Sequence, residues 1–119
     1  MESKSLLVVI SSAPYAGSDA AWNAIRLAET ALKNGSVTRV FLINEAVDAG
    51  RDALTPPDGA FDLCDMLVDL AAKGAEIKYC KTCIDRCGVG EGEMASSLKV
   101  GSMGELNRWI MDSDRVVTF

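Results

Sequence analysis

The sequence has 119 residues, of which 49% are hydrophobic and 24% charged, a composition typical of a globular protein and not of a disordered one. Its 12 basic and 17 acidic residues give a net charge of −5, which argues against nucleic acid as a partner. The absence of histidine excludes histidine acid–base catalysis, Cys-His nucleophile activation and mixed Cys/His zinc sites. The length fits a single domain over residues 1–119.

The first half of the chain alternates apolar runs with one helical pattern. Residues 6–11 (LLVVIS) form a continuous, largely β-branched run, which predicts a strand buried on both faces. A loop with Pro14 and Gly17 follows, and Ser18 or Asp19 is suited to cap the next helix. That helix has an apolar face made of Trp22, Ile25, Ala28 and Leu32. Gly35 is suited to end it, and residues 38–43 (TRVFLI) predict a second strand.

The middle of the chain carries a long linker and a second helical pattern. Residues 44–59 contain two consecutive prolines and predict an irregular surface excursion. Residues 61–73 predict an amphipathic helix that ends at Gly74. One face of this pattern is formed by Ala60, Cys64, Leu67 and Ala71. Residues 75–80 (AEIKYC) then predict a third strand with one less-buried face, because apolar and polar residues alternate along most of it.

The last third predicts two short strands around a helix. We expect a helical turn at residues 93–97 and a strand at 98–101. Ser102 and Glu105 have the spacing of a capping box, which predicts a helix to about residue 112. We expect this helix to bury Leu106, Trp109 and Ile110, and residues 115–119 to form the final strand.

Strands alternating with helices indicate an α/β protein with a mainly parallel sheet covered on both faces. In such folds the reactive loops lie at the carboxyl ends of the strands, so the loops after the first three strands are expected to converge. The longest apolar run, residues 6–10, is far shorter than the roughly 20 residues of a membrane-spanning helix and too short for a secretory signal. We therefore expect a cytoplasmic protein with no membrane partner, in which clustered thiols indicate metal or redox chemistry before structural disulfides.

Three of the four cysteines follow the third strand, as Cys80-x-x-Cys83-x-x-x-Cys87. Cys64 is predicted to be a small buried hydrophobe on its helix. Cys80 is either structural or a second thiol that accepts, protects or resolves what forms on Cys83. Cys83 is the best candidate for a working thiol, since a helix start would stabilise its thiolate. Cys87 is either a resolving thiol or a small loop residue.

Three other interpretations of this segment have weaker support in the sequence. A structural zinc or iron–sulfur site usually needs four thiolates, and the loop supplies three, so a three-thiolate cluster is the only metal alternative. A thioredoxin-like dithiol enzyme lacks a candidate for its usual cis-proline, because all three prolines precede the motif. The glycines of residues 88–92 (GVGEG) lack the spacing and the lysine of a phosphate-binding loop. We therefore predict neither a cofactor nor a resident metal.

The chain resembles the DsrE/DsrF-like family, small α/β proteins that include sulfur carriers. The segments that carry the resemblance are residues 6–32, 40–47 (VFLINEAV), 79–89 (YCKTCIDRCGV) and 100–119. The resemblance implies a three-layer α/β/α sandwich with a mainly parallel five-stranded sheet. It also implies a homo- or hetero-oligomer, commonly a trimer or hexamer.

The same resemblance implies a sulfur relay, in which a loop cysteine takes sulfane sulfur from a donor protein as a persulfide and passes it to an acceptor protein. Cys83 matches the second cysteine of the family's Cys-x-x-Cys loop and Cys80 the first. Many relatives carry arginine directly before the glycine, whereas here Cys87 precedes Gly88 and the arginine is Arg86. The expected site is therefore Cys83, assisted by Cys80, Arg86 and Cys87, in a sulfurtransferase-like carrier.

The alternative is a non-catalytic oligomeric or thiol redox-sensing subunit. Tyr15 and Asn44, in the loops after the first two strands, are weaker candidates for the same edge.

Overall fold

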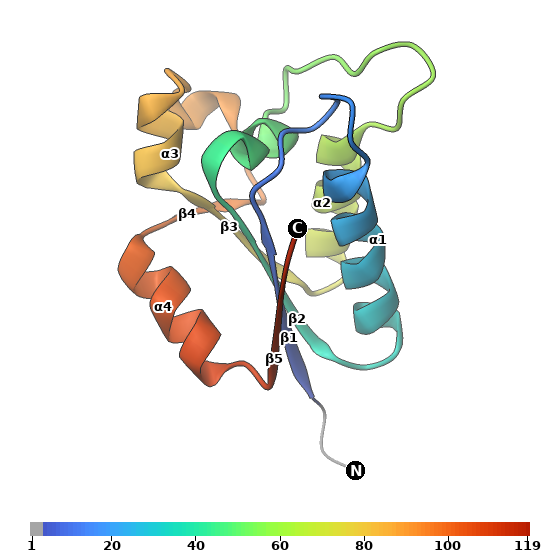
Figure 1. The fold of residues 1–119 in the computed structure, drawn as a ribbon, viewed down its shortest axis with the longest axis vertical. Coiled ribbons are helices and arrows are strands. Elements are labelled where there is room, and N and C mark those ends of the chain that lie inside the picture. Colours follow the sequence, from blue (N-terminus) through green and yellow to red (C-terminus); the bar gives the residue numbers. More distant parts are fainter. Residues whose placement is uncertain (1–3) are drawn as a thin grey trace.

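The computed structural model describes residues 4–119 (Figure 1). In chain order the elements are β1 (Ser5–Ile10), α1 (Ala20–Lys33), β2 (Val37–Leu42), the 3-10 helix η1 (Asn44–Gly50), α2 (Leu63–Ala72), β3 (Glu76–Cys80), α3 (Lys81–Arg86), the 3-10 turn η2 (Glu91–Glu93), β4 (Lys99–Gly101), α4 (Met103–Asp112) and β5 (Arg115–Thr118).

The five strands form one sheet in the order β4-β3-β2-β1-β5, and every neighbouring pair is parallel. Helices α1 and α2 cover one face, while α4 covers the other, with α3 above it at the carboxyl edge (Figure 1). The predicted three-layer α/β/α sandwich is therefore confirmed, and its sheet is wholly parallel.

The sheet separates two apolar cores of unequal size. Alternate residues of β1 point to opposite faces, so Val8 and Ile10 enter the larger core under α1 and α2 while Leu7 and Val9 enter the smaller one. The smaller core is closed by Phe41, Leu106 and Trp109, with the Phe41 and Trp109 rings edge to face at 5.9 Å.

Two expectations about buried residues were wrong. Ile110 was expected in the core but is 39% exposed, because the one buried stripe of α4 is filled by Leu106 and Trp109. Ala60 and Phe61 were placed in the second helix, yet both are exposed and precede it. That helix begins at Leu63 because the Asp62 carboxylate accepts the Asp65 N–H at 3.1 Å and caps it.

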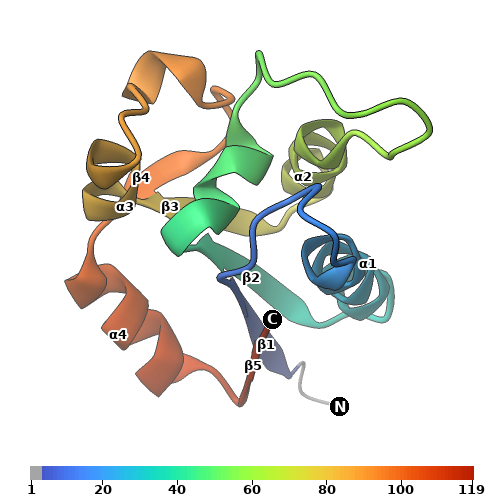
Figure 2. The same cartoon turned by 45° about the horizontal axis from the view of Figure 1, so that its top comes forward.

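The linker after β2 is also more ordered than expected. Its first half is η1, in which Ala46, Val47, Ala49 and Gly50 are buried. Small residues allow this backbone to lie close to the core: a Cβ on Gly50 would sit 2.8 Å from the Leu98 side chain. Figure 2 shows η1 above the carboxyl edge of the sheet, between α3 and α2. The surface excursion is therefore confined to the segment after η1.

The predicted capping signals were mostly confirmed. The Ser102–Glu105 capping box begins α4, and Gly35 and Gly74 adopt φ angles of +91° and +114° at helix ends. At the start of α1 the side chain of Asp19 caps nothing, and Ser18 Oγ accepts the Ala20 N–H at 3.2 Å instead. The turn expected at residues 93–97 lies earlier, at η2, because Met94 forms a bridge with Arg51. Within residues 4–119, no helix combines the length and the apolar character that crossing a membrane requires.

Candidate functional site

The carboxyl ends of β2 and β3 bring two chain segments together. Leu42 pairs with Tyr79 in the parallel register, so the residues that follow, Ile43 and Cys80, lie at the same edge. Cys80 is 3% exposed and packs in the smaller core. Its backbone is extended and its Sγ accepts the Cys83 N–H at 3.4 Å, so Cys80 is the cap of α3. Its structural role is therefore visible in the fold.

Cys83 is the third residue of α3 and the point where both cores meet the carboxyl edge. It is half-buried and packs against both apolar clusters. Its Sγ accepts the backbone N–H of Asn44 at 3.2 Å. Asn44 is the first residue of η1 and has a φ of +53°, a left-handed conformation that asparagine tolerates better than most residues. The turn after β2 thus aims an N–H at the sulfur of Cys83.

The pKa of Cys83 is raised from its ordinary value of 9.0, chiefly by burial and next by its hydrogen bond with Cys80. The Asn44 N–H acts in the opposite direction and is outweighed. We expected the helix start to favour the thiolate. A first turn of a six-residue helix does not overcome desolvation here, so the resting group at neutral pH is the thiol.

The N–H groups of the glycine loop bond to acceptors other than Cys83. Gly88 has a φ of +72° and ends α3: its N–H donates to the Asp85 carbonyl at 3.2 Å, and the Val89 N–H donates to the Ile84 carbonyl at 2.8 Å. The Gly90 N–H donates to the Glu93 carboxylate at 2.9 Å. These two glycines therefore shape the chain, and the Asn44 turn faces the sulfur instead.

The remaining expected site residues lie at the far end of α3. Cys87 is the exposed C-cap residue and Arg86 is the exposed last residue of the helix. Among residues 4–119, no hydrogen bond or ion pair joins Arg86 to Cys83. Lys81, at the start of the same helix, forms an ion pair with Asp85 at 2.6 Å. The structure thus brings Cys80 and Cys83 together and leaves Cys87 at the surface.

The cysteines do not assemble into a cluster. Nowhere in residues 4–119 do three or more Cys, Asp or Glu side chains lie where they could hold a metal ion. Cys64 is buried on α2, where burial raises its pKa to about 11, as befits the inert apolar residue predicted from the sequence.

A scan against family models matches residues 4–119 to the DsrE/DsrF-like family. Protein YchN of Escherichia coli K12 is 34% identical over 116 residues, which cover 96% of this chain and 97% of YchN. An uncharacterized protein of Methanopyrus kandleri is also 34% identical, over 96% of this chain and 93% of its own. The chain belongs to the DsrE/DsrF-like family. This is a sulfur-relay-type family, as the resemblance of the sequence implied.

Solved structures agree with this family assignment. The crystal structure of YchN from E. coli matches with a TM-score of 0.89 at 32% identity and covers 98% of this chain and 99% of its own. A protein of unknown function from Methanobacterium thermoautotrophicum matches with a TM-score of 0.71 at 10% identity, over 99% of this chain and 100% of its own, which shows a shared fold alone.

The importance of Asn44 was underestimated from the sequence, which made it only a weak candidate for the site. The contribution comes from its main chain, which any non-proline residue carries, so side-chain chemistry gave no strong signal. The available hint was an asparagine directly after a strand, since asparagine is favoured in left-handed turns. Tyr15, the other weak candidate, also has a positive φ, +61°, but its hydroxyl bonds to Phe61 and Leu63 and not to the thiol.

Proposed function

We propose that this protein is a sulfur carrier in which Cys83 holds sulfane sulfur as a persulfide between a donor and an acceptor protein. The observation that carries the proposal is the hydrogen bond from the Asn44 N–H to Cys83 Sγ, at the carboxyl edge of a parallel sheet in a sulfur-relay-type family. An N–H aimed at Sγ stabilises negative charge on that atom, which is the charge that Cys83 carries as an attacking thiolate and again as the thiolate released when the sulfur is passed on.

The transfer is a pair of thiol exchange steps. Cys83 loses its proton and attacks the terminal sulfur of a donor persulfide, R–S–SH. The donor sulfur–sulfur bond breaks and the Cys83–S–SH bond forms. The donor leaves as a thiolate that takes up the proton, so the products are Cys83–S–SH and R–SH. An acceptor thiolate then attacks the terminal sulfur and releases Cys83. No external oxidant or reductant is needed.

The raised pKa of Cys83 supports a carrier that reacts slowly until a partner docks. The sulfur-free protein keeps a thiol, which reacts slowly, and a Cys83 thiolate of high pKa is a poor leaving group, which limits loss of sulfur from the loaded protein to small thiols. A donor or acceptor that brings positive charge to the sulfur would lower that pKa. Arg86 and Cys87, exposed at the end of α3, are positioned for contact with such a partner.

The proposed carrier is cytoplasmic and a homo-oligomer, a trimer or hexamer. What supports assembly is the exposed apolar surface of α4 and the edge strand β5, which includes Met103 at 64% and Met111 at 76% exposure. Light scattering of the purified protein measures the subunit number, and a monomer at micromolar concentration would contradict this part of the proposal.

The test of the carrier function is persulfide transfer followed by intact mass and peptide mapping. A small-molecule persulfide donor should add one sulfur atom to the wild type, at Cys83, and to the matched variant Cys87→Ser. The Cys83→Ser variant should gain none. An equal gain in Cys83→Ser would overturn the assignment. A wild type that instead loses two hydrogens through a Cys80–Cys83 disulfide, with release of hydrogen sulfide, would favour the thiol redox-sensing alternative.

A further inference from the structure

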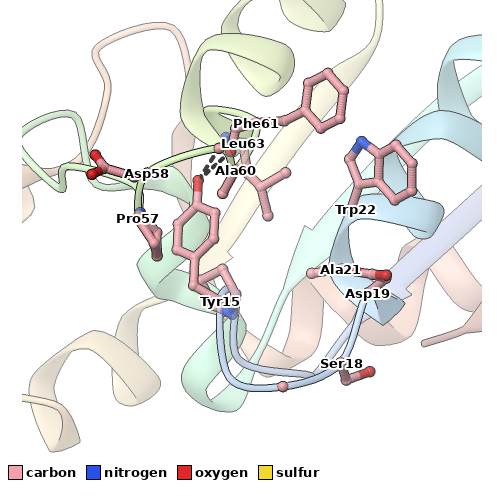
Figure 3. A pocket seen from close by; sticks show the side chains of 13 residues that line it. Tyr15, Ser18, Asp19, Ala21, Trp22, Pro57, Asp58, Ala60, Phe61 and Leu63 are labelled. Carbon is pink, nitrogen blue, oxygen red and sulfur yellow. Dashed lines mark hydrogen bonds between the residues drawn. The ribbon is translucent and has the colours of Figure 1, made fainter.

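A second candidate site lies at the same sheet edge but away from the cysteines. It is a cavity of about 540 Å³ between the loop after β1 and the segment before α2 (Figure 3). This volume is within the range of small-molecule sites, about 300–1,000 Å³. None of the cysteines lines it, so the sulfur chemistry proposed for Cys83 does not account for it.

Contacts between distant segments hold the walls of this cavity in place. The Tyr15 hydroxyl donates to the Phe61 carbonyl at 2.8 Å and accepts the Leu63 N–H at 2.9 Å (Figure 3). The Trp22 and Phe61 rings stack with centroids 5.2 Å apart and planes within 10°. Phe61 is nonetheless 61% exposed, which is unusual for a large aromatic side chain. The cavity thus presents a preformed aromatic wall.

The charge of the cavity is negative. Asp19 and Asp58 are the charged residues among its described lining, and neither belongs to an ion pair within residues 4–119. The start of α1 also lines the cavity and its dipole favours anions, but two full carboxylate charges exceed the half charge of a helix end. Arg26 lies 4.5 Å from the Trp22 ring centroid, so this aromatic wall already accepts a cation from outside the cavity.

We propose that this cavity binds a small organic cation with a flat apolar body, such as an arylalkylamine. The flat body lies against the exposed Phe61 ring, and the ammonium group is attracted by the negative charge of Asp19 and Asp58, which lie on opposite sides of the cavity (Figure 3). Aromatic contact supplies apolar burial, and the carboxylates discriminate against neutral and anionic analogues.

Three probes of one shape and different charge test this proposal: phenethylamine, phenethyl alcohol and phenylacetate. Trp22 is one of only two tryptophans, and Trp109 is buried beneath the opposite face, so tryptophan fluorescence reports on the cavity. We expect a saturable change with phenethylamine in the millimolar range that weakens with added salt. The alcohol should bind more weakly, and the anion not at all. The change should disappear in Trp22→Phe.

Carboxylate variants give an independent measurement. Asp19→Asn and Asp58→Asn should each weaken phenethylamine binding about two- to five-fold, as expected for an exposed ion pair. Asp112→Asn, an exposed substitution in α4 on the opposite face, should leave binding unchanged. Equal responses to all three probes, a preference for phenylacetate, or no saturable response in the wild type would overturn the proposal. Because Cys83 takes no part, persulfide transfer is expected to be unaffected by these variants.

Discussion

Two turns at the carboxyl edge of the sheet each contain a left-handed residue, but they make their contacts through different groups. Both the turn after β2 and the loop after β1 contain a non-glycine residue with positive φ, Asn44 at +53° and Tyr15 at +61°. Asn44 uses its main-chain N–H to contact the sulfur of Cys83. Tyr15 uses its side-chain hydroxyl to join its loop to Phe61 and Leu63.

The difference lies in what surrounds each turn. Asn44 begins η1, whose following residues are mostly buried, so its backbone is fixed by packing. Tyr15 lies in a loop whose next four residues are exposed, and it is fixed by two hydrogen bonds. Left-handed backbone in a non-glycine residue persists only where its surroundings enforce it, and such residues cluster at functional sites. One edge of the sheet therefore carries a thiol site set by the main chain and a cavity set by side chains.

Of the substitutions that test this difference between the two turns, Asn44→Val is expected to have the largest effect on stability and on the thiol site. A β-branched residue at a φ of +53° should lower the free energy of unfolding by about 2 kcal/mol. It should also move the N–H away from Cys83 and slow persulfide formation. Asn44→Gly is the matched control, because glycine keeps the N–H and accepts the angle without strain. Urea denaturation and Cys83 peptide mapping measure both properties. Equal unfolding free energies and equal persulfide formation in the two variants would show that the left-handed φ of residue 44 does not matter for stability or for the thiol site.

A smaller effect is expected from Tyr15→Phe. The variant loses two hydrogen bonds, but the Phe61 carbonyl lies in an exposed segment where water can replace the hydroxyl. We expect a loss of about 1 kcal/mol in unfolding free energy. Trp22–Phe61 packing should loosen, seen as a shift in tryptophan emission, while alkylation of Cys83 stays at the wild-type rate. A change in Cys83 reactivity would show that the two turns are coupled.

The sequence predicted the fold well because its signals were local. The apolar run of β1, the capping box before α4 and Gly35 after α1 each have one physical meaning, and each was confirmed. The prediction of an irregular surface linker was wrong over η1, because 3-10 helices have no strong periodic pattern in a sequence. The burial of Val47 also depends on the shape of the sheet edge.

The site was predictable only in part, for a related reason. The position of Cys80 and Cys83 at the end of a predicted strand was enough to predict that they lie at the carboxyl edge of the sheet, because the loops that follow parallel strands lie there. The direction of the Cys83 pKa shift was not predictable, because it depends on how deeply the sulfur packs between two cores. The role of Phe61 was missed because Phe61 was assigned to a helix, although Asp62 caps that helix and its first residue is Leu63.

The smallest effect, and the most specific to the thiol site, is expected from Cys80→Ser. Cys80 raises the pKa of Cys83, chiefly through a side-chain hydrogen bond, so replacing its thiol with a hydroxyl should lower that pKa. A lower pKa means more thiolate at neutral pH. Alkylation of Cys83 at pH 7.5 should therefore rise about two- to five-fold, while the plateau rate at high pH stays the same.

The companion variant Cys80→Ala separates the effect of Cys80 on the pKa of Cys83 from its effect on the helix. Alanine removes the same acidic group but also the acceptor for the Cys83 N–H, so α3 loses its cap, whereas serine retains one. Alanine should therefore shift the midpoint of the pH profile as serine does and also raise the plateau, because a frayed helix exposes the sulfur. Identical midpoints in the wild type and the serine variant would mean that burial alone sets the pKa of Cys83. Cys80 would then act on its neighbour only as the cap of α3.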